Sequence, residues 1–256
     1  MTQVLVGLDH VIVATADLDG AAAELGHALG LEVADGGRHP ALGTRNRLAW
    51  WGDSYLELVT IEDPDAAART WFGAAVATAL ADASAGPAGV VVASDDLDAD
   101  AAVTRAAEVS AGQRTRPDGR VVRWRTARSR AFGSPGPWPL VFMIEHDRTA
   151  AEWTDAERAA RATAVHPLGT PVRLRSVALG ATAVTGMVGR VGRELALLFR
   201  PALAGGGARD AALGRQTLRV APARPQEPRL TIDLEGGSTA RDLDLLGCRW
   251  RLTPSG

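Results

Sequence analysis

The stretch Leu8-Asp-His-Val-Ile-Val-Ala-Thr-Ala-Asp-Leu18 sets the fold of this chain. Its β-branched centre predicts a strand over residues 8–15. Asp17 follows as a helix N-cap, and apolar residues then recur at helical spacing up to Gly30, a C-terminal stop signal. The stretch therefore predicts a strand that leads directly into a helix over residues 18–29.

Three further strands follow this helix. A short strand is expected at 31–34, followed by a Gly/Pro-rich loop at 36–43. A tight turn at Gly52-Asp53-Ser54 then joins a strand at 46–51 to a strand at 55–61. The order is β-α-β-β-β, and it closes near Pro64.

The same pattern begins again at Gly89-Val-Val-Val-Ala-Ser-Asp-Asp-Leu97, which can be laid over residues 10–18. Both segments contain an apolar strand, a turn of small residues, and Asp-Leu opening a helix. The second helix is expected over 98–109, with strands at 119–126 and 140–145 and one strand poorly marked. An internal duplication is thus predicted before any motif is interpreted.

The rest of the chain is expected to contain a third, degenerate copy. Its strands are placed at 172–179, 194–199, 216–220 and 229–234, with a short helix at 182–188 and a terminal strand at 246–252. The predicted organisation is module 1 at 1–64, a helical connector at 65–84, module 2 at 85–148, a linker at 149–168, and the degenerate module 3 at 169–256.

Composition excludes several classes of function. The 256 residues are 46% hydrophobic and carry a formal net charge of -2, so no basic footprint for nucleic acid or anionic lipid is present. The single cysteine, Cys248, excludes an internal disulfide and a cysteine-based zinc cluster. No segment reaches the ~20 apolar residues of a membrane span, and the start does not look like a signal peptide. We expect a cytoplasmic protein with a small-molecule ligand.

At this point the residues resemble a known family. The opening strand and turn are similar to the start of vicinal oxygen chelate proteins, which include glyoxalase I, extradiol dioxygenases and bleomycin-resistance proteins. The loop His39-Pro40 with Gly43-Thr-Arg-Asn46, followed by Tyr55-Leu-Glu-Leu58, resembles the glyoxalase-like subgroup. The resemblance covers most of residues 5–180. It implies an α+β fold in which tandem βαβββ modules form curved, half-open barrel sheets around a cleft.

The resemblance also implies a ligand set from the first and last strands of each module. In this chain those positions hold His10, Glu57 and Glu145, which we predict as metal ligands, with Glu57 or Glu145 as a general base. The fourth position is Gly89, so the four-residue set is broken. Such donors suit one divalent ion (Zn, Fe, Ni, Co or Mn), and a pocket without metal is an equal alternative.

Further residues are predicted to bind the substrate. His39, Thr44 and Asn46 come from the loop, because functional groups concentrate on loops held by rigid scaffolds. Trp51 and Tyr55 lie on barrel strands and would supply an apolar wall. The structural alternatives are a turn built by Gly43 and a buried His10–Glu57 hydrogen bond without function.

Two functions of different kinds follow. The first is a glyoxalase-like small-molecule enzyme, a lyase or isomerase, acting in the barrel cleft with or without a metal. The second is a non-catalytic protein that sequesters a small molecule, as bleomycin-resistance proteins do, or a site that has decayed. An odd number of modules also leaves one module without a mate, which a homodimer would supply.

Overall fold

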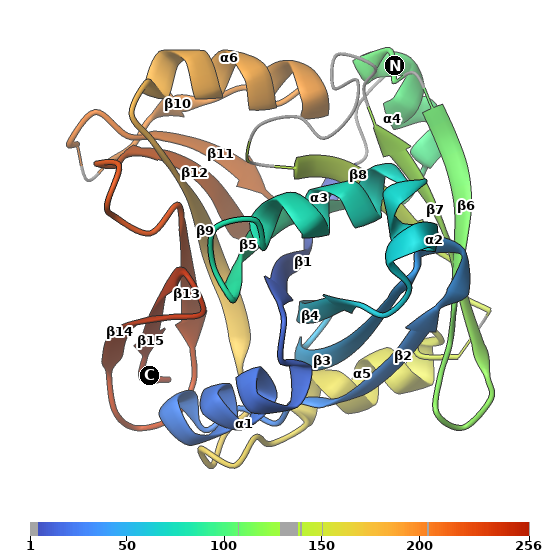
Figure 1. Cartoon of the computed structure of the whole chain (residues 1–256). Helices are drawn as coiled ribbons and strands as arrows, with labels where there is room; N and C mark the ends of the chain where they lie inside the picture. The colour runs from blue at the N-terminus through green and yellow to red at the C-terminus, as the bar shows by residue number, and fades with distance from the viewer. Residues whose placement is uncertain are drawn as a thin grey trace.

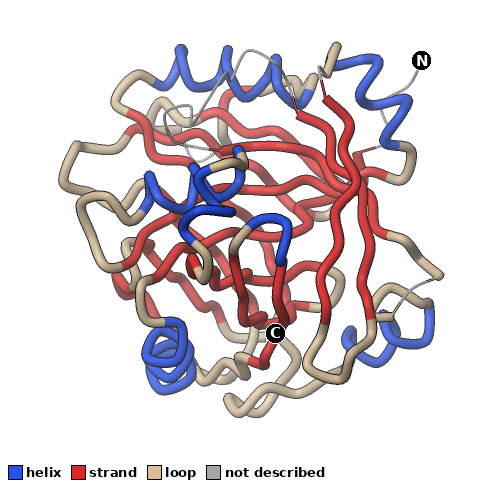
Figure 2. The backbone as a smooth tube through the Cα atoms, turned by 45° about the vertical axis from the view of Figure 1, so that its right-hand side comes forward, coloured by secondary structure: helices blue, strands red, loops and turns tan. Residues whose placement is uncertain are grey.

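The computed structural model describes residues 5–106, 108–128, 138, 140–149, 151–203 and 205–255. It contains a closed eight-stranded barrel and a seven-stranded open sheet. Strands run through the middle of the molecule and most helices lie at its margins (Figures 1 and 2). The predicted α+β fold with tandem βαβββ modules is confirmed.

The first module follows the predicted order. The side chain of Asp17 accepts a hydrogen bond from the Gly20 amide at the start of the first helix, and Gly30 ends that helix with a left-handed φ of 69°. Its elements are β1 (Leu5–Thr15), α1 (Leu18–Leu29), β2 (Ala34–His39), the 3-10 turn η1 (Pro40–Leu42), β3 (Thr44–Trp51) and β4 (Ser54–Ile61).

The strand β2 corrects one expectation, since much of it was predicted as a loop. Gly36 and Gly37 lie inside it, and a Cβ at either position would collide with Asn46 Oδ1 or with the Thr115 carbonyl oxygen. These glycines therefore let neighbouring groups approach the backbone closely, which is a recognised use of glycine in strands.

The second module comprises β5 (Ala85–Ser94), α4 (Leu97–Thr104), β6 (Glu108–Thr115), β7 (Val121–Arg128) and β8 (Leu140–His146). The helix was expected to reach Val109, but it stops at Thr104 because Arg105 adopts a left-handed φ of 53°. Val109 instead belongs to β6, the strand that the sequence marks poorly. Most residues of β6 are exposed or half-buried, so its apolar pattern is weak.

The two modules close into a barrel with strand order β1-β4-β3-β2-β6-β7-β8-β5. β1 runs parallel to β4 and antiparallel to β5, and β5 runs parallel to β8. Between β2 and β6 the only paired residues are Arg38 and Thr115, among the residues described. The expected half-open barrel is thus closed, with one weak seam.

The connector between the modules fills one end of the barrel. It consists of α2 (Pro64–Ala68) and α3 (Trp71–Ala79), which lie across the barrel in Figure 1. Phe72 and Val76 belong to one buried cluster with Ile12 and Ala14, which point into the barrel. Near the opposite end, the segment 151–154 and α5 (Asp155–Thr163) follow β8.

The second sheet repeats the pairing pattern of the barrel. Its order is β10-β11-β12-β9-β13-β15-β14. β9 runs parallel to β12 and antiparallel to β13, and β13 runs parallel to β15. The elements are β9 (Arg173–Ala181), α6 (Val184–Leu195), β10 (Arg200–Pro201), β11 (Arg209–Leu213), β12 (Gln216–Pro222), β13 (Leu230–Glu235), β14 (Arg241–Leu245) and β15 (Cys248–Thr253).

This pattern changes the interpretation of the C-terminal part. β9 to β12 form one βαβββ unit, and β13 to β15 form a shortened mate, which has no counterpart of α4 or β6 among the described residues. The strand expected at 194–199 is absent because α6 continues to Leu195. Since the chain itself pairs the third unit, the odd module count no longer gives a reason to expect a homodimer.

The outer faces of the barrel and the open sheet share one core. Val11 and Val13 of the barrel belong to the same buried cluster as Val177 and Leu179 of the sheet, and so does Cys248. Trp51 of β3 meets Trp250 of β15 edge-on, with ring centroids 6.3 Å apart. In the part of the chain that the structure describes, no helix has the length and apolarity of a membrane span.

Candidate active site

The barrel encloses a cavity of about 90 Å³. It lies between α3 at one end and the segment with Glu152 and Trp153 at the other. Much of its wall is aromatic, contributed by Trp50, Tyr55, Trp71, Phe72, Trp124, Phe142 and Trp153. The polar side chains that line it are His10, His39, Asn46, Glu57, Ser110, Arg114, Thr126, His146 and Glu152. This is an apolar chamber with a few convergent polar groups, which is typical of small-molecule sites.

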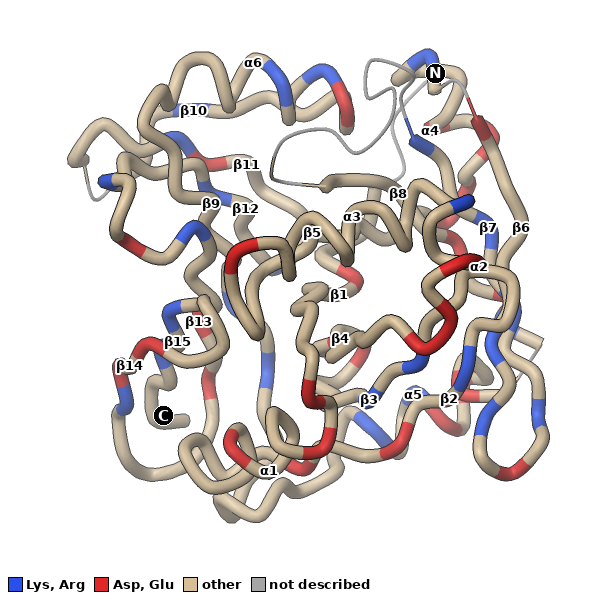
Figure 3. Tube along the Cα trace, in the orientation of Figure 1, with Lys and Arg blue, Asp and Glu red and all other residues tan. Residues whose placement is uncertain are grey.

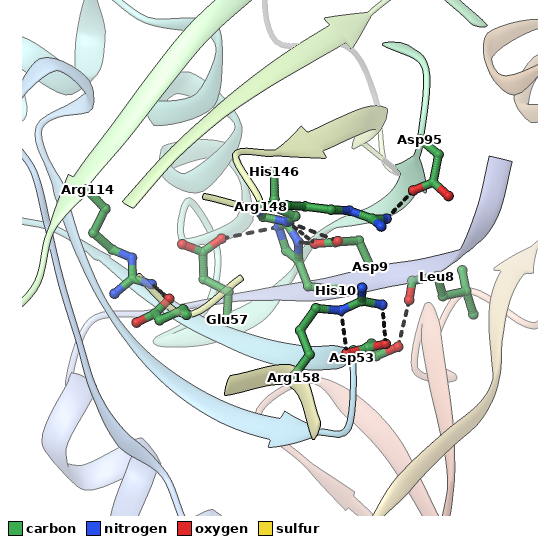
Figure 4. A network of polar contacts seen from close by, with 12 residues as sticks. Leu8, Asp9, His10, Asp53, Glu57, Asp95, Arg114, His146, Arg148 and Arg158 are labelled. Carbon is green, nitrogen blue, oxygen red and sulfur yellow. Dashed lines mark hydrogen bonds and ion pairs between the residues drawn. The ribbon is translucent and has the colours of Figure 1, made fainter. Parts of the chain in front are cut away.

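Asp9 connects two histidines of the site. The pairing of β1 with β5 shifts register between Leu8 and His10, so side chains do not alternate regularly between the two faces of the strand here. Asp9 Oδ1 lies 2.6 Å from His10 Nδ1, and Asp9 Oδ2 lies 3.0 Å from His146 Nε2. Figure 4 shows the carboxylate of Asp9 in contact with both imidazoles. Asp9 thereby fixes both rings and joins β1 to the end of β8.

The charge state of Asp9 sets the tautomer of His10. Burial alone would raise the pKa of Asp9, but the charge of His146 and the hydrogen bonds from His10 and His146 outweigh burial and hold that pKa well below its usual range. An ionised carboxylate only accepts hydrogen bonds, so His10 must donate from Nδ1. The Nε2 atom of His10 then points toward Glu57.

Glu57 is the carboxylate at the centre of the cavity. It is 6% exposed and accepts a hydrogen bond of 2.6 Å from Asn46 Nδ2. His10 Nε2 lies 3.6 Å from Glu57 Oε2, and His39 Nε2 lies 3.9 Å from Glu57 Oε1. Among the described residues, no arginine forms an ion pair with it. A buried carboxylate without a cationic partner is costly, which marks Glu57 as a functional candidate.

His39 is a neutral hydrogen-bonding group beside Glu57. Burial lowers its pKa to about 4, and the charge of Arg114 acts in the same direction, although the charge of Glu57 opposes both. Its Nδ1 atom lies 3.0 Å from Thr44 Oγ1. Thr44 does not line the cavity but orients the ring that does.

Tyr55 forms the wall beside His10. The two rings stack with centroids 4.5 Å apart. Burial raises the pKa of the Tyr55 phenol well above its usual range, and the negative charges of Asp9 and Glu57 add to this effect. The phenol therefore stays protonated.

A buried ion pair lies in the cavity wall near the end of the barrel occupied by Trp153. Arg114 NH2 lies 2.5 Å from Glu152 Oε2, and Arg116 NH1 lies 2.8 Å from Glu152 Oε1. Glu152 adopts a φ of 75°, which is uncommon for a residue other than glycine. The next residue, Trp153, stacks on His146 with centroids 3.6 Å apart. These contacts hold the segment 152–153 across the cavity.

A family model described as a glyoxalase-like domain matches residues 8–191. This span contains the barrel except for the first three residues of β1, and it continues into α6 of the second sheet. The chain belongs to the glyoxalase-like domain family. It is therefore a member of the vicinal oxygen chelate superfamily, as the sequence resemblance predicted.

One solved structure shares the fold over nearly the full length of this glyoxalase-like chain, and others resemble it more weakly. A hypothetical protein from Staphylococcus aureus is similar with a TM-score of 0.73 and 14% identity, over 97% of this chain and 99% of that one. Methylmalonyl-CoA epimerase from Mycobacterium tuberculosis is similar over 57% of this chain and 91% of its own, with 22% identity and a TM-score of 0.42. The Mn(II)-bound glyoxalase from Novosphingobium aromaticivorans is 12% identical over 92% of this chain and 67% of its own, with a TM-score of 0.48. A search of curated proteins gave no match.

The donor set does not fit the metal site that the glyoxalase-like family resemblance implied. A side chain at Gly89 would place its Cβ 2.8 Å from the Leu140 carbonyl oxygen, so this position has no room for a ligand. Glu145 does not line the cavity. Among the described residues, no group of three or more His, Cys, Asp or Glu side chains is arranged to share one ion.

Two predicted site residues lie elsewhere. Glu145 accepts hydrogen bonds from the Arg125 guanidinium, at 2.6 Å from NH2, on the outside of the barrel. The last strand does present one of its two final residues inward, but that residue is His146. Trp51 faces the shared core and Trp250, because its neighbour Trp50 takes the inward position on β3. The roles predicted for Glu145 and Trp51 are corrected accordingly.

Five of the other six predicted residues lie together in the cavity wall, and the sixth, Thr44, lies behind His39. His10, His39, Asn46, Tyr55 and Glu57 all line the cavity. Sequence reasoning missed six polar residues of the site: Asp9, Ser110, Arg114, Thr126, His146 and Glu152. The alternation argument already required one of residues 145 and 146 to face inward, so His146 was within reach, whereas Asp9 depends on a register shift that the sequence does not mark.

The buried His39 predicts a specific pH dependence of stability. Its pKa is about 4 in the folded protein and near 6.5 when unfolded, so the unfolded chain binds a proton first as pH falls. Stability should therefore be lost between about pH 6.5 and pH 4, by up to about 3 kcal/mol from this group. Urea unfolding at a series of pH values gives the free energy of unfolding as a function of pH. The slope of this free energy against pH should be shallower for His39→Gln than for the wild type. His27→Gln, an exposed change on α1, should leave the slope unchanged. Equal slopes for the wild type and His39→Gln would contradict the prediction.

Proposed function

We propose that the chain is an enzyme of the isomerase or lyase type that moves a proton on a small molecule bound in the barrel cavity. The family supports a small-molecule enzyme of the vicinal oxygen chelate type. The observation that carries the proposal is Glu57, a buried carboxylate facing the cavity, with the Asp9-bound His10 imidazole 3.6 Å away.

In this proposal Glu57 is the general base. It would remove a proton from a carbon next to a carbonyl group, because such a proton is acidic enough for a carboxylate to abstract. Asn46 holds one oxygen of Glu57 and leaves the other, Oε2, on the side of His10. The carboxylate is thereby oriented before the ligand enters.

His10 would receive that proton from Glu57 at Nε2, which lies 3.6 Å from Oε2, and the resulting imidazolium would return it to another atom of the substrate or to its leaving group. Asp9 holds Nδ1, so proton exchange takes place at Nε2 alone, which is how a carboxylate directs an imidazole in other enzymes. The neutral His39 imidazole and the Tyr55 phenol are hydrogen-bonding groups for the oxygen on which charge develops. An isomerase and a lyase both need this combination of a base and an acid.

A second function is favoured by the aromatic wall. Trp50, Trp71, Trp124 and Phe142 could hold a flat apolar compound with no chemical step, which is sequestration as in bleomycin-resistance proteins. The two proposals differ in whether a bound compound exchanges protons with solvent.

Deuterium exchange distinguishes the two functions. The protein would be incubated in D₂O with a panel of low-molecular-weight aldehydes, ketones and carboxylic acids, and the label followed by NMR. If the protein is a lyase or isomerase, we expect one of these classes of compound to gain deuterium at the carbon next to its carbonyl group. Glu145→Gln should exchange at the wild-type rate, since Glu145 lies outside the cavity. Binding would be followed by tryptophan fluorescence. If compounds bound but none of them gained deuterium, this result would contradict the proposed enzymatic function and support sequestration.

A further inference from the structure

A second cavity lies where the barrel meets the open sheet. This cleft has a volume of about 600 Å³ and opens near the start of β1 and the end of β8. It shares Ile144, His146 and Trp153 with the barrel cavity, so these residues form the wall between the two. The Asp9 side chain, which binds His10 and His146, also lines it.

Five arginines line this cleft: Arg148, Arg158, Arg173, Arg175 and Arg215. Elsewhere, basic and acidic residues are interspersed along the chain (Figure 3), so such a group is a local feature. The acidic residues of the cleft are Asp9, Asp53 and Asp95. Asp9 already accepts hydrogen bonds from two histidines, so its negative charge is largely stabilised by groups of the barrel.

Three of the five arginines form ion pairs with carboxylates, including Arg175 with Glu235, and two do not. Arg148 pairs with Asp95, and Arg158 binds both oxygens of Asp53, as Figure 4 shows. Arg173 and Arg215 are exposed, and neither forms an ion pair with another described residue. The cleft therefore has a surplus of positive charge directed at solvent.

The open sheet holds the backbone at Arg215 against the barrel. Arg215 lies in the turn between β11 and β12, next to Gly214, where a Cβ would lie 2.5 Å from the Val6 carbonyl oxygen. The adjoining Gln216 side chain accepts from the Leu8 amide at 2.7 Å and donates to Ser54 Oγ at 2.8 Å. The backbone that presents Arg215 is thus fixed before any ligand arrives, which lowers the cost of binding.

We propose that this cleft binds an oxyanion, namely a phosphate or carboxylate group of a small molecule. The guanidinium group is planar and presents paired N–H donors that match both kinds of anion. A volume of about 600 Å³ is in the range of sites for small organic ligands. The proposal requires binding only, so it stands or falls separately from proton transfer at Glu57.

Calorimetric titration with pyrophosphate and with malonate tests this site. The experiment uses the full chain at low ionic strength, because salt screens exposed charges. The double variant Arg173→Gln/Arg215→Gln should bind the preferred anion roughly tenfold or more weakly than the wild type. The matched control Arg69→Gln/Arg200→Gln removes two exposed arginines outside the cleft and should bind within about twofold of the wild type.

Each outcome of the titration has a definite meaning. Tighter binding of pyrophosphate supports a phosphate-bearing ligand, and tighter binding of malonate supports a carboxylate ligand. Absence of binding by both anions at millimolar concentration overturns the proposal. Equal weakening in the two double variants also overturns it, since net charge alone would then explain binding. Thermal unfolding of both variants checks that they remain folded.

Discussion

Replacing Glu57 by glutamine should lower the rate of deuterium exchange about 10²–10⁴-fold, which is the usual contribution of a general base. Glutamine has nearly the shape of glutamate, and its oxygen can still accept the hydrogen bond from Asn46. The folded structure and the binding of the ligand should therefore be kept while the base is lost. The measurement is the initial rate of label incorporation, with tryptophan fluorescence reporting binding.

The control for this prediction is Glu145→Gln. Both changes remove one carboxylate from a barrel strand, but Glu145 is bound to Arg125 on the outside. We expect its exchange rate to match the wild type. If Glu57→Gln exchanged as fast as Glu145→Gln, Glu57 would not be the base.

The largest effect on stability is expected for Arg114→Met. The Arg114 and Glu152 side chains are 6% and 9% exposed, so the change leaves a buried carboxylate with one of its two arginines. Removing one partner of a buried pair is strongly destabilising, and because Arg116 remains we expect a loss of about 3 kcal/mol in the free energy of unfolding. Urea unfolding measures this loss.

Two further variants make this prediction specific. Arg125→Met removes two ion pairs on the outside of the barrel, with Asp98 and Glu145, and should cost less than about 1 kcal/mol. The double variant Arg114→Met/Glu152→Leu should recover much of the lost stability, because it removes both buried charges together. A loss below 1 kcal/mol for Arg114→Met alone would show that the pair does not hold the segment 152–153 in place.

Local signals predicted the first module well. Asp17 and Gly30 mark the ends of α1, and both act there as their side chains and backbone preferences suggest. The apolar runs at β1 and β5 are buried on both faces, so their sequence is unambiguous. The likeness of residues 89–97 to 10–18 indicated the duplication that builds the barrel.

Elements without a buried face were predicted less well. β6 is mostly exposed, β2 contains two adjacent glycines, and β10 has only two residues. Their strand conformation depends on pairing with neighbours distant in sequence, which no local pattern records. The pairing of β13 to β15 with the rest of the second sheet is likewise a long-range contact, so the sequence did not indicate it.

The site was predicted in part, and the missing part has a physical cause. Period-two alternation correctly grouped His10, Tyr55 and Glu57. It cannot foresee a register shift, so Asp9 was not connected with His10 and His146. It also could not decide between Glu145 and His146, because they are consecutive residues at the end of β8 and only the packing of that strand determines which one faces inward.

The protonation state of His10 tests the central claim most directly. The chain has five histidines, so their ring nitrogens can be assigned by ¹⁵N NMR with single His→Gln variants. At neutral pH we predict that His10 carries its proton on Nδ1, hydrogen-bonded to ionised Asp9, and that its Nε2 signal shifts when a compound that undergoes exchange is added. A His10 ring that averages between tautomers, and whose signals do not respond to that compound, would contradict a site built on Asp9, His10 and Glu57.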